Sequence, residues 1–210
     1  MAPMLLTILF MLTLVTPTQD PVAAALENYR NVTSYRVTLH SVDGDEAEVI
    51  RYFYKRPGFV RMEFVRPHKG ALLVYDPGTK TIRLRPFSFF SPFVLTLSPD
   101  DSLVQSAQGH RVDASDIGAF LLRVKRLQEH GTTVIREDET VEGKSALTVS
   151  VKGKGDFAVE GVHQYLLWLD KVTMLPLKTA AYGVDGNLIE EVRMEGLELN
   201  VKLDGNFFKL

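Results

Sequence analysis

Apolar and polar residues alternate with a period of two over most of this 210-residue chain. In 35–42, Tyr35, Val37 and Leu39 alternate with polar residues, which is typical of a strand with one buried face. The same alternation, interrupted by Gly, Pro and Asp turn residues, continues along the chain. It predicts further strands at 48–54, 59–65, 71–75, 81–85, 133–137, 146–152, 162–169, 177–182 and 188–198.

Two segments have helical spacing instead. Asp20 followed by Pro21 is typical of a helix start, and Val22, Leu26 and Tyr29 then recur at helical intervals, which predicts a helix to about residue 31. A second apolar stripe consists of Ile117, Phe120, Leu121, Val124 and Leu127 and ends before Gly131, with Asp113 or Ser115 as its expected cap.

Short turns between successive strands predict antiparallel neighbours, so we expect an α+β fold. A single twisted sheet of about ten to eleven strands tends to curl into a half or open β-barrel. Two amphipathic helices then cover its concave face and leave an apolar space beneath them. We expect one domain over 20–210.

The first residues have a different composition. Residues 4–15 are almost wholly apolar, a length that suits a signal peptide rather than a membrane span. We therefore predict an export signal at 1–19 and a periplasmic location for the folded part. The alternative is an uncleaved anchor, because no Lys or Arg precedes the apolar run.

Composition narrows the range of functions. The chain has no cysteine, which excludes disulfides, thiolate metal sites and lipid attachment through an N-terminal cysteine. Its Lys and Arg residues are dispersed and its formal net charge is -2, which argues against a nucleic-acid partner.

Candidate catalytic patterns are weak. The five histidines lie at no metal-ligand spacing, and no nucleophile elbow or phosphate loop is present. Gly153, Gly155 and Ala158 fit the loosest dinucleotide fingerprint, but a strand follows them where that fingerprint requires a helix. The acidic runs 43–46 and 137–139 fall in turns and are expected to be solvated. We predict a protein that is not an enzyme and has no metal or cofactor.

Residues 86–112 are irregular and contain four phenylalanines, Phe87, Phe89, Phe90 and Phe93. An apolar surface loop is typical of a lid or a membrane contact. The alternative is a loop folded back onto the core, and the sequence leaves both interpretations open.

Several short stretches, in order, resemble the LolA/LolB family of lipoprotein carriers. They are Tyr54 to Phe59 with Met62 to Phe64, Pro67 with Leu72 to Asp76, Leu167 to Lys171 with Leu175 to Leu177, and Asn200 with Phe207 and Phe208. The resemblance implies a half barrel closed by helices, whose apolar cavity holds acyl chains. It also implies that Arg56 bonds to the helical lid and keeps the cavity closed; the alternative is a solvated arginine beside a turn.

The function we predict is an exported carrier that shelters the acyl chains of a lipid or lipoprotein. Candidate lining residues are Val37, Leu39, Phe53, Met62, Phe64, Leu73 and Trp168. The opposite strand faces are equally open, because a shift of one residue exchanges the two faces of a strand. Donor and acceptor proteins at the inner and outer membranes are the expected partners of a monomer. The alternative function is a periplasmic interaction or sensor module of the same fold.

Overall fold

The computed structural model describes residues 20–43, 46–86, 93–105 and 109–210. The predicted export signal at 1–19, and Phe87, Phe89 and Phe90, lie outside these residues.

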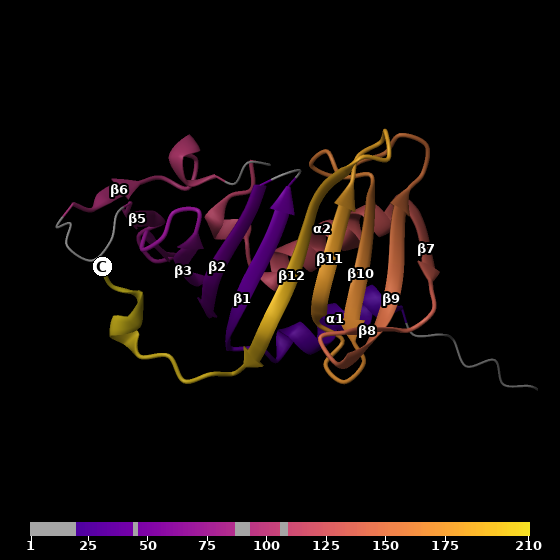
Figure 1. Ribbon diagram of the computed structural model, residues 1–210, viewed down its shortest axis with the longest axis horizontal. Coiled ribbons are helices and arrows are strands. Elements are labelled where there is room, and N and C mark those ends of the chain that lie inside the picture. Colours follow the sequence, from indigo (N-terminus) through magenta and orange to yellow (C-terminus); the bar gives the residue numbers. More distant parts are fainter. Residues whose placement is uncertain (1–19, 44–45, 87–92, 106–108) are drawn as a thin grey trace, which may run out of the picture.

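The described chain forms one open antiparallel sheet of twelve strands (Figure 1). Its spatial order is β6-β5-β4-β3-β2-β1-β12-β11-β10-β9-β7, with β8 beside β9. The strands are β1 (Ser34–Asp43), β2 (Glu46–Lys55), β3 (Phe59–Arg66), β4 (Leu72–Asp76), β5 (Thr81–Arg85), β6 (Leu95–Leu97), β7 (Gly131–Ile135), β8 (Glu139–Val141), β9 (Lys144–Gly153), β10 (Gln164–Asp170), β11 (Pro176–Tyr182) and β12 (Leu188–Leu199). The predicted fold class, an open antiparallel sheet with two helices, is confirmed.

The pairing of β1 with β12 joins two halves of the sheet that are far apart in sequence. Tyr35 lies opposite Leu199, and Leu39 lies opposite Met194. Every other pairing connects strands that are close along the chain. The β1–β12 pair therefore places the N-terminal meander and the C-terminal meander on one continuous surface.

Two strands and three single-turn helices were not predicted. β6 and β8 have three residues each, too few for an alternation to be visible. The single-turn 3₁₀ helices are η1 (Ser102–Val104), η2 (Val112–Ala114) and η3 (Gly205–Phe208). The segment expected to be irregular between 86 and 112 therefore contains a short edge strand and one complete turn of helix.

The two helices are α1 (Pro21–Arg30) and α2 (Ile117–Glu129). Asp20 caps α1 as predicted, accepting a hydrogen bond from the amide of Val22. The predicted cap of α2 is wrong: Asp116 caps it, accepting hydrogen bonds from the amides of Gly118 and Ala119. Asp113 instead pairs with Arg111, and the Ser115 hydroxyl bonds to the carbonyl of Val112.

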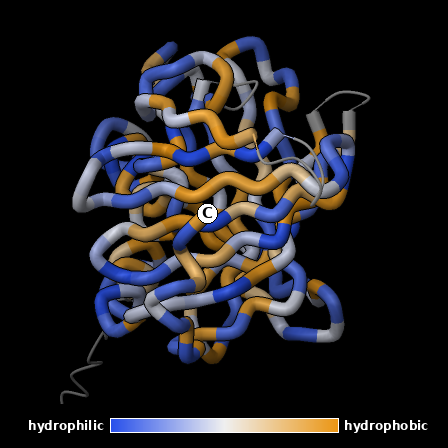
Figure 2. Tube along the Cα trace, turned by 90° about the vertical axis from the view of Figure 1, so that its left-hand side faces the viewer, coloured by the Kyte–Doolittle hydropathy of each residue, from blue (hydrophilic) through white to orange (hydrophobic). Residues whose placement is uncertain are grey.

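The helices pack on one face of the sheet, behind β9 to β12 in Figure 1. Val124 and Leu127 of α2 are fully buried against Val149 and Leu167, on the inward faces of β9 and β10. Figure 2 shows hydrophobic and hydrophilic positions interspersed along the strands. Successive side chains of a strand point to opposite faces, so β9 and β10 each give one apolar side to this core.

The outer face of the sheet has its own smaller apolar contacts. Trp168 and Leu177 form a buried cluster there, against which Val141 of β8 packs. Phe53 of β2 contacts Phe207 of η3 edge to face, with ring centroids 4.8 Å apart. Both strand faces of this protein are therefore apolar in places, and the alternation alone does not identify the inner one.

Candidate functional site

A cavity of about 150 Å³ lies between the inner face of the sheet and the start of α2. Most of its lining is apolar: Val37, Leu39, Ile117, Phe120, Val162, Ala181, Ile189, Val192 and Met194. The polar residues of the lining are Tyr35, Tyr52, His110, Ser115, Arg123, Tyr165, Thr179 and Glu190. Strands from both halves of the sheet contribute, because β1 lies beside β12.

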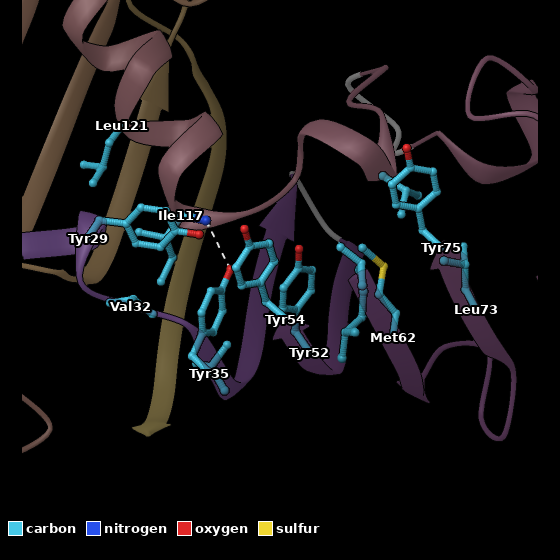
Figure 3. Close-up of a cluster of buried hydrophobic side chains, with 14 of the residues drawn as sticks. Tyr29, Val32, Tyr35, Tyr52, Tyr54, Met62, Leu73, Tyr75, Ile117 and Leu121 are labelled. Carbon is cyan, nitrogen blue, oxygen red and sulfur yellow. Dashed lines mark hydrogen bonds between the residues drawn. The ribbon is translucent and has the colours of Figure 1, made fainter. Parts of the chain in front are cut away.

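Tyrosines of the inner face fix the start of α2 above the sheet. The amide of Ile117 donates to the Tyr35 hydroxyl at 3.1 Å, drawn as the dashed line in Figure 3. The Tyr52 and Ser115 hydroxyls are 2.9 Å apart, and the Tyr29 hydroxyl donates to Asp116 at 2.7 Å. Burial raises the pKa of Tyr29, Tyr35 and Tyr52 above the usual range, so these hydroxyls stay protonated at physiological pH. We call these four contacting residues of the sheet and helices, Tyr29, Tyr35, Tyr52 and Asp116, the helix seat.

The tyrosine rings also pack against one another. Tyr35 stacks on Tyr54 with ring centroids 5.2 Å apart and on Tyr52 at 5.8 Å. Such pairs contribute about 0.5–1.5 kcal/mol beyond the area they bury. The stack holds the hydroxyls at one level, facing α2, as Figure 3 shows.

Three charged or titratable residues, His110, Arg123 and Glu190, line the cavity, and Glu160 lies beside two of them. Glu160 Oε2 is 3.6 Å from Arg123 Nε and 3.8 Å from His110 Nδ1. Glu190 accepts a hydrogen bond from the Ser41 hydroxyl at 2.7 Å. Burial, and next the Arg123 guanidinium, lowers the pKa of His110, while Glu190 and Glu160 oppose this effect. His110 is therefore a neutral imidazole at pH 7.

Arg56 bonds to a helix, as its resemblance to the carrier motif implies. Its Nη2 donates to the carbonyl oxygen of Tyr29, in the last turn of α1, at 3.0 Å. Its guanidinium carbon also lies 5.9 Å from the centroid of the Tyr29 ring. A cation at a helix C-terminus is electrostatically favourable. Its action as a latch on the cavity stays a prediction.

The structure distributes the predicted lining residues over two faces. Val37 and Leu39 line the cavity. Met62, Phe64 and Leu73 lie on the same face in the core of the N-terminal meander, away from the cavity lining. Phe53 and Trp168 lie on the outer face, against Phe207 and beneath Lys178, respectively. Of the four phenylalanines of 86–112, only Phe93 is described, and this residue is 55% exposed.

Several lining residues were not predicted. Ile117 and Phe120 belong to the apolar stripe that predicted α2, but the stripe does not distinguish a residue over a cavity from one over packed strands. Phe120 meets Tyr165 edge to face, with centroids 5.5 Å apart. Val192 and Met194 come from β12, whose sequence mixes apolar and charged residues on both faces.

Metal-ion clusters and membrane-spanning helices are both absent from the described residues. Within them, no cluster of three or more His, Asp or Glu side chains has a geometry that would hold a metal ion. None of the helices in the same residues has the length and apolarity needed to cross a bilayer.

Known structures share this architecture. The chain is similar to the Mycobacterium tuberculosis lipoprotein LppX, at 9% identity and a TM-score of 0.56, over 88% of this chain and 96% of that one. It is similar to MucB in the Pseudomonas aeruginosa MucA/MucB complex, at 18% identity and a TM-score of 0.52, over 91% of this chain and 60% of that one. A LolA superfamily protein from Nitrosomonas europaea matches at 13% identity and a TM-score of 0.42, over 91% and 97% of the two chains. No curated protein matches in sequence.

The helix-covered open sheet defines the class: the protein has the fold of LppX and MucB, in agreement with the LolA-like fold that the sequence resemblance predicted. The chain belongs to the MucB/RseB N-terminal domain family, whose sequence model matches residues 93–209. The match covers α2 and the C-terminal meander, which supply most of the cavity lining.

Proposed function

We propose that this protein is an exported binding protein that shelters an apolar group, in particular an acyl chain of a lipid or lipoprotein, in the cavity beneath α2. The observation that carries the proposal is the apolar cavity itself, enclosed by β1, β10, β11, β12 and the start of α2. The fold of LppX and the carrier-like sequence motifs support it.

The size of the cavity sets what it can hold in the described conformation. An apolar cavity of about 150 Å³ accommodates benzene, a molecule of six carbons. A sixteen-carbon chain gains about 12 kcal/mol when it leaves water, at ~0.8 kcal/mol per CH₂. The cavity therefore shelters one end of such a chain, and the remainder requires the space that α2 occupies.

Displacement of α2 from the sheet would enlarge the cavity. The start of α2 is bound by the few hydrogen bonds of the helix seat, each worth about 0.5–1.5 kcal/mol net. The gain from burying a long chain offsets the loss of these bonds and of part of the apolar surface that α2 buries through residues such as Val124 and Leu127. A carrier needs this balance, because the cargo must also be released.

A tryptophan in the cavity tests the site. Leu39→Trp adds volume at a half-buried lining position and should reduce uptake of a fluorescent acyl ester several-fold. Phe53→Trp is the matched control, because Phe53 faces outward from the neighbouring strand. Equal uptake by Leu39→Trp and the wild type would contradict the site, and loss of uptake in Phe53→Trp alone would move the site to the outer face.

The wider role belongs to the same proposal. We propose that residues 1–19 direct export, that the folded part acts in the periplasm as a monomer, and that it receives cargo from an inner-membrane donor and passes it to an outer-membrane acceptor. The apolar run at 4–15 supports export. Exposed Phe93 supports a lid or membrane contact by the 86–112 segment.

A second candidate function is recognition of a protein partner. Its support is membership of the MucB/RseB N-terminal domain family together with the structure of MucB bound to MucA. The chain spans 60% of that MucB chain, so any partner of the whole protein is itself a proposal.

Native mass spectrometry of the protein purified from its own exported fraction separates the two functions. A bound acylated species supports the carrier and identifies its cargo. A bound polypeptide, together with failure to take up a fluorescent acyl ester, supports the partner-binding module instead.

A further inference from the structure

One hydrogen-bond donor of the cavity lining makes no hydrogen bond within the described residues: its nearest carboxylate oxygen, Oε2 of Glu160, is 3.6 Å away. Nε of Arg123 is buried and has no hydrogen-bond partner there, although the side chain of Arg123 is 15% exposed overall. Nη1 of the same guanidinium donates to the carbonyl of Ala114 at 2.9 Å. A buried donor without an acceptor costs about 1–3 kcal/mol, so a ligand that supplies an acceptor gains affinity there.

The second such donor in the described residues, Nε of Arg85, belongs to β5 and does not line the cavity. The unmet donor of Arg123 is thus combined with an apolar space. A ligand that satisfies both features has an apolar chain that ends in a hydrogen-bond acceptor.

The surrounding charges decide which acceptor fits. Glu160 lies 3.6 Å from Arg123 Nε, and Glu190 lines the same cavity. Two carboxylates repel a third, so an anionic head group is disfavoured beside them. An ammonium group is disfavoured by Arg123 itself and has no acceptor to offer. A neutral carbonyl oxygen accepts the hydrogen bond without either repulsion.

We propose that Arg123 is a ligand-binding residue that receives the carbonyl oxygen of an ester- or amide-linked acyl group, whose first carbons occupy the apolar cavity. The inference rests on the proposed function, because it requires that the cavity binds an apolar chain. It adds the substrate class: acyl esters and amides rather than free fatty acids or alkyl amines.

Small ligands that fit the cavity test this selectivity. Methyl butyl ketone, hexene, hexanoate and hexylamine share a chain of suitable length and differ in the end group. Dissociation constants are measured by NMR titration for the wild type, Arg123→Met, Arg123→Lys and Arg126→Met. Arg126 is the matched control, because it lies one turn further along α2 and is exposed.

We expect the wild type to bind the ketone at least about tenfold more tightly than hexene, the effect of one hydrogen bond to a charged donor. The ratio should approach one in Arg123→Met, fall in Arg123→Lys, which lacks Nε, and stay unchanged in Arg126→Met. Binding of hexene by each variant shows that its cavity is intact.

Three outcomes overturn the inference. Equal binding of ketone and hexene by the wild type would contradict the role of Arg123 in binding a carbonyl, but it would still support the proposed apolar cavity. Tighter binding of hexanoate or hexylamine than of the ketone assigns a charged ligand instead. Failure of all four ligands to bind the wild type rejects the proposed function together with the inference.

Discussion

The hydroxyl of Tyr29 donates a hydrogen bond of 2.7 Å to Oδ1 of Asp116, the carboxylate that caps α2. The same oxygen accepts hydrogen bonds from the amides of Gly118 and Ala119. Tyr29 lies in the last turn of α1, so one carboxylate both terminates α2 and joins it to α1. Any movement of α2 away from the sheet must break this contact or carry α1 with it.

Removing the Tyr29 hydroxyl tests this link. Tyr29→Phe keeps the buried ring and loses a hydrogen bond to a carboxylate, so the free energy of unfolding should fall by about 2 kcal/mol. Urea denaturation measures the change. Tyr182→Phe is the control, because no hydrogen bond of the Tyr182 hydroxyl lies within the described residues. Equal stabilities of the wild type and Tyr29→Phe would show that the contact contributes nothing.

A methyl group at Gly118 probes the space between the two helices. A Cβ there would lie 2.8 Å from Cδ1 of Tyr29 and 2.9 Å from Oδ1 of Asp116, closer than packed atoms approach. Alanine improves helix propensity by at most about 1 kcal/mol. Overpacking costs about 1–3 kcal/mol, so we expect Gly118→Ala to be destabilised by about 1–2 kcal/mol.

The thermal midpoint of Gly118→Ala, compared with that of Gly205→Ala, checks this expectation. A Cβ at Gly205 meets no atom within 4 Å, so this variant should unfold at the wild-type temperature. A midpoint of Gly118→Ala at or above the wild-type value would mean that the Tyr29 ring moves aside at no cost.

Arg56 should hold the end of α1 against the sheet. Arg56→Gln removes the hydrogen bond to the Tyr29 carbonyl, and we expect faster hydrogen exchange of amides in the last turn of α1 and about 1 kcal/mol less stability. Faster uptake of an apolar fluorescent probe is expected if this contact also closes the cavity. Arg30→Gln, at an exposed position in the same turn, should leave both rates unchanged. Unaltered hydrogen exchange in Arg56→Gln would show that Arg56 does not stabilise the last turn of α1.

His110 should make stability depend on pH. Its pKa in the folded protein is lowered by burial and by Arg123, while Glu190 and Glu160 act in the opposite direction. The unfolded chain takes up the proton near pH 6.5, before the folded protein does. Between these two pKa values the unfolded chain carries the extra proton, so stability is full above about pH 6.5 and declines as pH falls through this window.

Urea denaturation of the wild type and His110→Gln at pH 7.5 and at pH 5 measures the effect. The stability of the wild type relative to His110→Gln should be lower at pH 5 than at pH 7.5. The difference between the proteins isolates His110 from the carboxylates of the cluster, which titrate in both. A difference that is constant with pH would contradict the depressed pKa.

The sequence by itself determined the fold class and the position of most of the strands and of both helices. Alternation over ten segments predicted the antiparallel strands, and Asp20 with Pro21 placed the start of α1, because these signals depend on neighbours along the chain. β6 and β8 were not predicted, because a strand of three residues is too short to show an alternation of apolar and polar positions. The cap of α2 was predicted at Asp113 or Ser115, but it is Asp116, the residue after Ser115. The sequence could not distinguish them, because all three side chains are suited to capping.

The inner face of each strand was decided only by the tertiary structure. β2 has aromatic residues on both faces: Tyr52 and Tyr54 point inward, and Phe53 packs outward on Phe207. The tyrosine hydroxyls need polar partners, and Tyr52 finds one on the inner face in Ser115, just before α2, whereas Phe53 needs only apolar cover. The cavity, likewise, unites residues as distant as Leu39 and Met194 through the β1–β12 pair, and no local pattern records that pairing.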